Sequence, residues 1–142
     1  MSWIRAVVLT VALIAIWISG AGQMGGFLGV IGAGNAPTEW VAEQIYNVQG
    51  STDRPFGVNV PLFSPYVDQV IDLCIQERVP VVTTGAGNPG PYIQPLHKAG
   101  IKVFPLVSSV ALARRLARQG VDGLVVEGHE SGGHVGDVST LP

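Results

Sequence analysis

The residue types best suited to chemistry gather near the end of the sequence, where Glu127, His129, Glu130 and His134 alternate with glycines. They follow a short apolar run, residues 123–126, whose length suits a strand buried on both faces. Glycines directly after such a run let the backbone approach a ligand closely. An imidazole can exchange protons near neutral pH. The stretch therefore predicts a loop at the carboxyl end of a strand that carries ionisable groups into a cleft.

Two other interpretations of this stretch are a metal site and a plain solvated loop. His129, Glu130 and His134 have the residue types of the zinc-protease helix, which requires its histidines four residues apart on one helical face. Here the spacing is five, and the glycine pair at 132–133 disfavours the helix that would aim both rings at one ion. No metal is therefore expected, and the choice between a site loop and a solvated loop depends on the rest of the chain.

The composition indicates one small domain, or part of a larger one, without a nucleic-acid partner. The chain has 142 residues, a net charge of −2, a pI of about 5.8 and only 13% charged residues. Nucleic-acid-binding proteins usually show clustered Lys and Arg. The basic cluster Arg114, Arg115 and Arg118 instead suits the last turns of a helix, where cations complement the helix dipole. The lone Cys74 excludes an internal disulfide and falls in an apolar helical stripe, as a core residue would.

The segment 1–24 is apolar and has two interpretations. Arg5 precedes an apolar run of 13 residues, which is shorter than the about 20 residues that a transmembrane helix needs. The run suits the core of a signal peptide followed by small residues at 19–22, and it equally suits a buried first helix or strand. We expect a cytoplasmic protein for which a membrane association is not favoured, with a signal peptide or anchor as the open alternative.

Gly20, Gly22 and Gly25 match the spacing of a dinucleotide-binding fingerprint, which must open a helix. The repeated glycines of residues 26–34 oppose a helix, so we interpret the match as chance. Residues 28–31 predict instead a short buried strand that ends in a glycine-rich loop.

From that strand onward, apolar runs alternate with helical patterns. Further strands are expected at 55–60, 79–84, 101–104 and 121–126, so that strands recur every roughly 20 to 25 residues. Such alternation predicts a parallel sheet with right-handed crossovers, either an open doubly wound sheet or part of an eight-stranded barrel. In both, the carboxyl ends of the strands meet at one edge, and the residues expected there are Asn59, 83–85 and 127–128.

Helices are expected between these strands. Pro37 is placed to start the first helix, and Ser64 with Pro65 to cap and start the second. A third helix is expected from Tyr92 to Gly100, with His97 as a surface residue rather than a ligand. Ser109 is expected to cap the fourth helix, whose inward residues are predicted to be Leu112, Ala113, Leu116 and Ala117.

Four motifs in this order resemble those of the nitronate monooxygenase and enoyl-acyl-carrier-protein reductase II family. They are GAGNAP at 32–37, PFGVNV at 55–60, TTGAGNP at 83–89 and EGHESGGH at 127–134. The resemblance implies a flavin enzyme of the α/β class, with residues 25–142 forming part of a (β/α)8 TIM barrel, roughly its strands 2–6. Residues 1–24 then form a separate apolar segment or an altered start. The chain stops before the seventh and eighth strands, near which such barrels frequently bind phosphate.

The resemblance also implies the site residues. Asn59, Glu127 and Gly132 match positions that contact FMN in the family, and His134 matches its catalytic histidine. The motif at 83–89 is more similar to the reductase branch, which implies hydride transfer from NAD(P)H through FMN to an enoyl thioester, free or linked to an acyl carrier protein. The alternatives are a nitronate monooxygenase that oxidises nitroalkane anions, and a non-catalytic product with an N-terminal targeting segment. An incomplete barrel would leave edge strands near Leu28 and Leu124 unpaired, so we expect homo-oligomers or aggregation.

Overall fold

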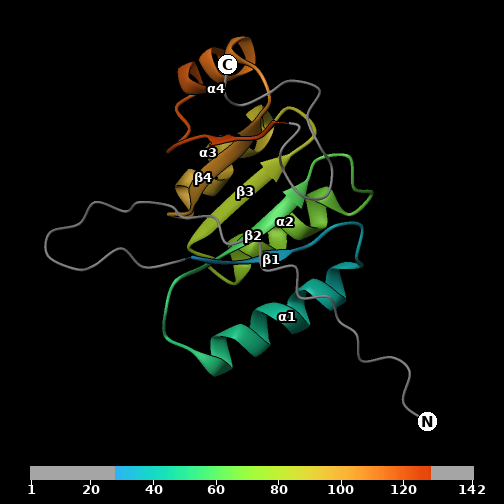
Figure 1. The fold of residues 1–142 in the computed structure, drawn as a ribbon. Helices are drawn as coiled ribbons and strands as arrows, with labels where there is room; N and C mark the ends of the chain where they lie inside the picture. Colours follow the sequence, from blue (N-terminus) through green and yellow to red (C-terminus); the bar gives the residue numbers. More distant parts are fainter. Residues whose placement is uncertain (1–27, 129–142) are drawn as a thin grey trace, which may run out of the picture.

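The computed structural model describes residues 28–128, in which strands and helices alternate along the chain (Figure 1). The strands are β1 (Gly29–Gly32), β2 (Phe56–Pro61), β3 (Val81–Gly85), β4 (Lys102–Val107) and β5 (Val125–Val126). The helices are α1 (Thr38–Ser51), α2 (Val67–Gln76), α3 (Gly90–Lys98) and α4 (Val110–Arg118). Of these helices, none is long and apolar enough to cross a membrane.

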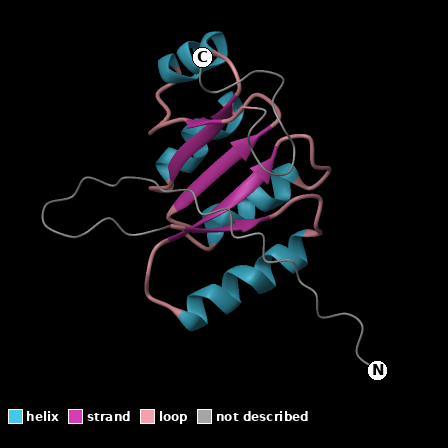
Figure 2. Cartoon of the chain, viewed as in Figure 1, coloured by secondary structure: helices cyan, strands magenta, loops and turns pink. Residues whose placement is uncertain are grey.

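The strands form one sheet in the order of the chain, β1-β2-β3-β4-β5, and each neighbouring pair is parallel. Each helix is therefore a crossover between adjacent strands, and in Figure 2 the helices are gathered on one side of the sheet. A sheet that grows in one direction with its helices on one face is the arrangement of a (β/α)8 barrel. The parallel sheet of alternating strands and helices and the partial barrel predicted from the sequence are confirmed.

The core lies between the sheet and its helices. Val58, Val82 and Val103 are in register on neighbouring strands, and all three side chains are fully buried. They belong to the same buried cluster as apolar residues of α1, α2 and α3, among them Ile45 and Leu96. Fully burying one such side chain stabilises the fold by about 1.5–3 kcal/mol. This cluster therefore fixes the helical face of the sheet.

The second and fourth helices test the predicted caps. Ser109 Oγ accepts the Leu112 N–H at 3.2 Å, which confirms the cap of α4. The second helix begins at Val67 and not at Pro65, because Ser64 Oγ accepts the Tyr66 N–H at 3.3 Å and so closes a turn before the helix. Ala117 of α4 is exposed, contrary to the prediction, whereas Leu116 is buried and Leu112 and Ala113 are half-buried.

The fifth strand is shorter than predicted. It spans two residues instead of six, because the chain from Asp122 to Leu124 approaches β4 without continuing the regular ladder. Gly123 packs so closely on Phe104 that a Cβ atom at this position would lie 2.7 Å from the ring atom Cε1. The apolar run of the sequence therefore predicts the right position in the sheet but a longer strand than the one that forms.

Candidate functional site

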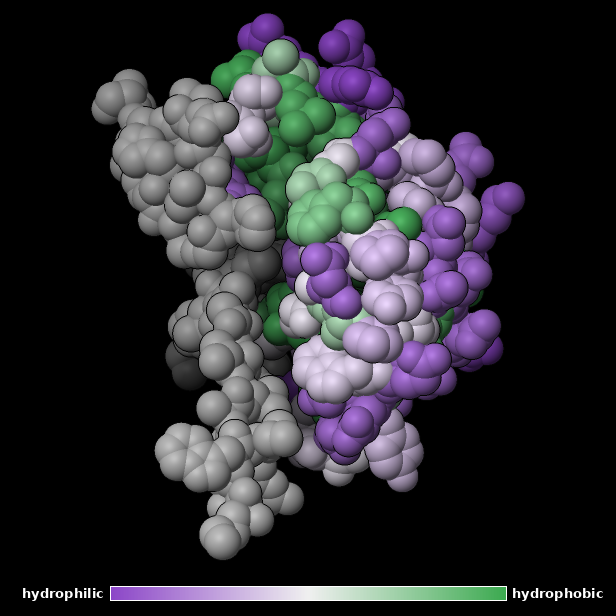
Figure 3. All heavy atoms as spheres, turned by 90° about the vertical axis from the view of Figure 1, so that its right-hand side faces the viewer, coloured by the Kyte–Doolittle hydropathy of each residue, from purple (hydrophilic) through white to green (hydrophobic). Residues whose placement is uncertain are grey.

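The carboxyl ends of the five strands meet at one edge of the sheet, toward the right in Figure 1. Figure 3 views the molecule from that side. It shows a hydrophobic area in the upper middle of the picture and hydrophilic side chains along its right-hand side. The loops of this edge follow β1, β2, β3, β4 and β5, and they contain the polar and glycine motifs that the sequence singled out. We call this region the carboxyl edge.

Asn59 and Thr83 lie on the face of the sheet that is turned away from the helical core. Side chains alternate along a strand, so the burial of Val58 and Val60 against the helices places Asn59 on the opposite face. Asn59 Nδ2 donates to Thr83 Oγ1 at 2.8 Å, and the register continues from these two residues to Gly32 on one side. Thr83 is 0% exposed, whereas Asn59 is half-buried. The hydroxyl therefore fixes the amide in an orientation from which Asn59 can meet a ligand.

The surface beside Asn59 is built from glycine. A Cβ atom added to Gly32 or Gly34 would meet nothing within 4 Å, so the space in front of these residues is open. Gly87 differs, because its Cβ would come within 2.6 Å of Leu62 Cβ. Together with the Leu62 N–H bond to the Gly85 carbonyl at 2.8 Å, this contact joins the loops after β2 and β3 into one surface. The packed loops around Leu62 and Gly87 therefore lie next to an open surface formed by Gly32 and Gly34, which we call the glycine floor.

Glu127 follows β5 at the same edge. Its N–H donates to the Val107 carbonyl at 2.9 Å, and the residue is half-buried. Three strand spacings separate β2 from β5, which is roughly 14 Å along the sheet at about 4.8 Å per strand. The structure thus places Asn59 and Glu127 at one edge but not in contact. Gly132 and His134, the other two predicted site residues, lie outside the described residues, as does His129.

Charge is distributed unevenly between the two ends of the sheet. The described loops of the carboxyl edge contain no Lys or Arg. At the amino ends of the strands, Arg54 and Arg78 line a shallow hollow of about 400 Å³ with Phe56 and Pro80. The carboxyl edge can therefore offer backbone N–H groups, an amide and hydroxyls, but no fixed positive side chain from the described part of the chain.

Two buried side chains with potentially reactive groups, the thiol of Cys74 and the hydroxyl of Thr84, lie outside the site. Cys74 is fully buried, and burial raises the pKa of its thiol to about 12, so it stays protonated as a core residue. Thr84 is 1% exposed and pairs with Val60, which places it on the helical face. Thr84 Oγ1 has no hydrogen-bond partner in the described structure. Within residues 28–128, no group of three His, Cys, Asp or Glu side chains could hold a metal ion.

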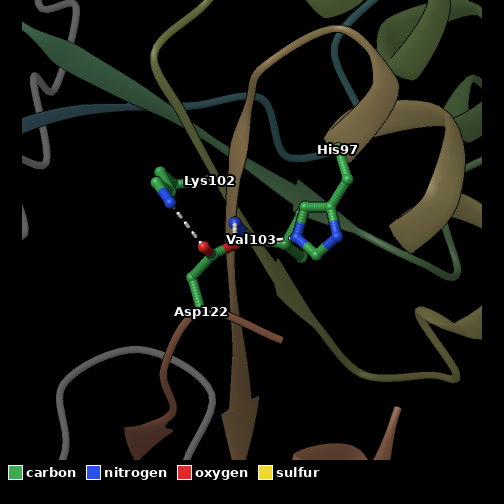
Figure 4. Close-up of polar contacts among 4 residues, drawn as sticks. All are labelled: His97, Lys102, Val103 and Asp122. Carbon is green, nitrogen blue, oxygen red and sulfur yellow. Dashed lines mark hydrogen bonds and ion pairs between the residues drawn. The ribbon is translucent and has the colours of Figure 1, made fainter. Parts of the chain in front are cut away.

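A polar cluster that the sequence did not predict lies at the amino end of β4. His97, interpreted as a plain surface residue, has its Nε2 atom 2.8 Å from Asp122 Oδ2, and Lys102 Nζ lies 2.9 Å from Asp122 Oδ1 (Figure 4). Burial alone would raise the pKa of Asp122, but hydrogen bonds from Lys102, from the Val103 N–H and from His97 hold that pKa below its usual value. The three side chains come from separate elements, so no local motif signals the cluster.

Comparison with known proteins places these features in a family. The family described as nitronate monooxygenase matches residues 63–141. A (3aS,4S,5R,7aS)-5-hydroxy-7a-methyl-1-oxo-octahydro-1H-indene-4-carboxyl-CoA dehydrogenase of Mycobacterium tuberculosis is 32% identical over 87% of this chain and 36% of its own length. A probable nitronate monooxygenase of Staphylococcus haemolyticus is 30% identical over 81% of this chain and 42% of its own length. The chain thus spans about two fifths of these relatives or less.

Solved structures agree on the fold. FabK from Thermotoga maritima superposes with a TM-score of 0.78 at 49% identity, covering 82% of this chain and 37% of FabK. A nitroalkane oxidase from Streptomyces ansochromogenes superposes with a TM-score of 0.69 at 24% identity, covering 77% of this chain and 41% of the oxidase. At that lower identity the second likeness concerns the fold alone.

Proposed function

Because the chain belongs to the nitronate monooxygenase family, we propose that it is part of an FMN-dependent oxidoreductase whose flavin binds at the carboxyl edge. The observation that carries this proposal is the Asn59–Thr83 pair, an oriented amide beside the open glycine floor at Gly32. Ligands of parallel α/β folds bind at the carboxyl ends of the strands. The pair therefore stands where a cofactor of this fold is expected.

The residues present fit the ring of a flavin better than its phosphate. A flat heterocycle requires open space, a surface without side chains and neutral hydrogen-bonding groups at its edge, which Gly32, Gly34 and Asn59 offer. A phosphate is usually held by helix N-termini, glycine-rich backbone or basic side chains. The described loops of this edge have no basic side chain. Within residues 28–128, a phosphate at this edge would therefore be held by glycine-rich backbone and helix N-termini and not by a basic side chain.

The roles proposed for Asn59, Thr83 and Glu127 follow from their places at the carboxyl edge, and those of Gly132 and His134 from the resemblance to the family. Asn59 would bind the polar rim of the ring, and Thr83 would hold the amide in that orientation. Glu127 and Gly132 would contact the cofactor from the other side of the edge. His134 would hold or move the proton that accompanies turnover, as an imidazole can near neutral pH. FMN, when bound, supplies the redox chemistry itself.

For the substrate we favour an enoyl thioester, free or linked to an acyl carrier protein, with NAD(P)H as the reductant. The motif at 83–89 and the 49% identity to FabK support this branch. A second candidate is the oxidation of nitroalkane anions, supported by the family match and by the similarity to a probable nitronate monooxygenase. The two candidates differ in their need for NAD(P)H, which makes them separable by experiment.

The test begins with the cofactor of the purified intact protein. A visible flavin spectrum, with the released cofactor identified as FMN by chromatography, is expected, and a colourless protein that binds no added FMN would contradict the proposal. Anaerobic addition of NADH or NADPH should then bleach the flavin in the reductase case. Oxygen uptake with a nitronate but no bleaching by either nicotinamide would select the alternative.

Two variants locate the flavin. Asn59→Ala and Glu127→Ala should each weaken FMN retention, because each removes a proposed contact. Asp72→Ala is the matched control, since Asp72 is an exposed residue of α2 on the helical side. Equal FMN affinity in all three variants would place the flavin elsewhere.

A further inference from the structure

We propose that Asp122 is a positioning residue that fixes the register of β5 and thereby the place of Glu127; the consequence for flavin rests on the function proposed above. The need for such a residue follows from the length of β5. Two residues, Val125 and Val126, pair with β4, whereas the neighbouring pairs β2–β3 and β3–β4 have longer ladders. A ladder of two residues specifies register weakly, and a slip of one residue would turn each side chain to the other face.

Asp122 adds the missing ladder contacts ahead of β5. Its N–H donates to the Val103 carbonyl at 3.1 Å, and its carboxylate Oδ2 accepts the Val103 N–H at 2.9 Å. Both polar groups of the Val103 backbone are thus bound by one residue, as they would be by a neighbouring strand. The Asp122 carboxylate here accepts the hydrogen bond that a backbone carbonyl would accept in a regular strand. Asp122 thus pairs with β4 ahead of the first residue of β5.

The same carboxylate contacts two further side chains. His97 Nε2, in the last turn of α3, lies 2.8 Å from Oδ2, and Lys102 Nζ, at the start of β4, lies 2.9 Å from Oδ1 (Figure 4). The Asp122 side chain is only 17% exposed. Hydrogen bonds to a charged group are stronger than those between neutral groups. Asp122 therefore has a single well-defined position relative to both α3 and β4.

The segment between Asp122 and Glu127 transmits this position. Gly123 packs on the Phe104 ring with no room for a side chain, and Val125 then pairs with Leu106. At the far end, the Glu127 N–H donates to the Val107 carbonyl at 2.9 Å. The segment is thus fastened to β4 at both ends, at Val103 and at Val107. Release of the Asp122 end removes the first of these two attachments of the segment to β4.

Amide hydrogen exchange in the intact, cofactor-free protein tests this inference. In Asp122→Ala the amide of Glu127, which donates to Val107, should exchange at least about tenfold faster, while those of β2 and β3 keep their rates; a tenfold change corresponds to about 1.4 kcal/mol. Asp122→Asn should have a smaller effect, since its amide oxygen can still accept the Val103 N–H. Asp72→Asn on the exposed side of α2 is the matched control and should change none of these rates.

Unchanged exchange at Glu127 in a folded Asp122→Ala would overturn the inference, and so would an equal rise in every strand, which indicates general destabilisation. Should Asp122→Ala not fold, Lys102→Met and Asp122→Asn provide the same comparison, with a selective rise at Glu127 required from Asp122→Asn. FMN titration of the same variants separates the two proposals. Faster exchange at Glu127 with unaltered FMN affinity would keep the role of Asp122 and contradict the flavin contact of Glu127.

Discussion

The two ends of the sheet are built on opposite principles. At the carboxyl edge, the surface of Gly32 and Gly34 is open, and the polar groups beside it, Asn59 and Thr83, are neutral and hydrogen-bonded to each other. At the amino end, the Asp122 carboxylate is bound by the side chains of Lys102 and His97 and by the backbone N–H of Val103. The carboxyl edge thus has open space beside neutral polar groups, whereas the amino end has basic side chains, including Arg54 and Arg78 around a hollow of its own.

Helix direction explains part of this difference. Every helix runs back from the carboxyl edge, so its last turn lies at the amino ends of the strands, where Lys98, Arg115 and Arg118 are favoured by the helix dipole. The helix N-termini, with their unpaired N–H groups, face the carboxyl edge. The basic side chains thus lie at the amino ends of the strands, where they stabilise the C-termini of the helices. The carboxyl edge keeps its helix N-termini available for a ligand. The comparison predicts that changes at the two ends have different consequences.

The largest expected effect separates two histidines. His134→Ala should lower turnover by about 10²- to 10⁴-fold, the usual cost of losing a general acid or base, while FMN stays bound. His97→Ala is the matched change at the amino end and should leave turnover within a few-fold. Steady-state rates with enoyl thioesters and with nitronates, together with flavin content, measure both. Near-normal turnover by His134→Ala would show that the catalytic histidine is wrongly assigned.

The next effect is on stability and belongs to the amino end. Asp122→Ala should lower the free energy of unfolding by about 2 kcal/mol, because it removes a charged acceptor from three donors. Urea unfolding of the variant, with Asp72→Ala as the exposed control, measures the loss. Equal midpoints for Asp122→Ala and the parent would show that the cluster of Figure 4 contributes no net stability.

Neighbouring threonines of β3 provide a smaller pair of opposite effects. Thr84→Val should raise the free energy of unfolding by about 1 kcal/mol, because it removes a buried hydroxyl that has no partner among the described residues and keeps the shape. Thr83→Val should lower it by a similar amount, because it leaves Asn59 Nδ2 without its acceptor. Thermal unfolding of the two variants gives the comparison. Shifts of the same sign would contradict the assignment of Thr83 and Thr84 to opposite faces.

The elements that the sequence predicts well are those with long apolar patterns. The stripe of Val70, Ile71 and Cys74 in α2 is buried as predicted, and so are the strands around Val58 and Val82, because their burial repeats at the period of a helix or a strand. The parallel order of the strands follows from the same alternation. These features are local in sequence, so one sequence contains enough information to predict them.

The features that the sequence missed depend on contacts between distant residues. The contact of His97 with Asp122 spans 25 residues, and neither residue lies in a distinctive motif. Gly123, just before the short β5, packs on Phe104, a contact that no periodicity in the sequence indicates. Of the candidate site, Asn59 and Glu127 are at the predicted edge, while the roles of Asn59, Glu127, Gly132 and His134 stay predictions.

The smallest expected effect is the pH dependence of the Asp122 cluster. The pKa of Asp122 is lowered in the folded protein, so the stability that it contributes is present above its unfolded value, near 3.8, and is lost as the pH falls through the folded pKa. The parent should therefore lose more stability between about pH 4 and more acidic solution than Asp122→Asn does. Well above pH 4 this carboxyl is ionised in both the folded and the unfolded parent. The titration of Asp122 should therefore not change the difference in the free energy of unfolding between the parent and Asp122→Asn there. Urea unfolding of both proteins at a series of pH values tests the sign, and parallel curves across the acidic range would show that the three donors do not favour the charged form.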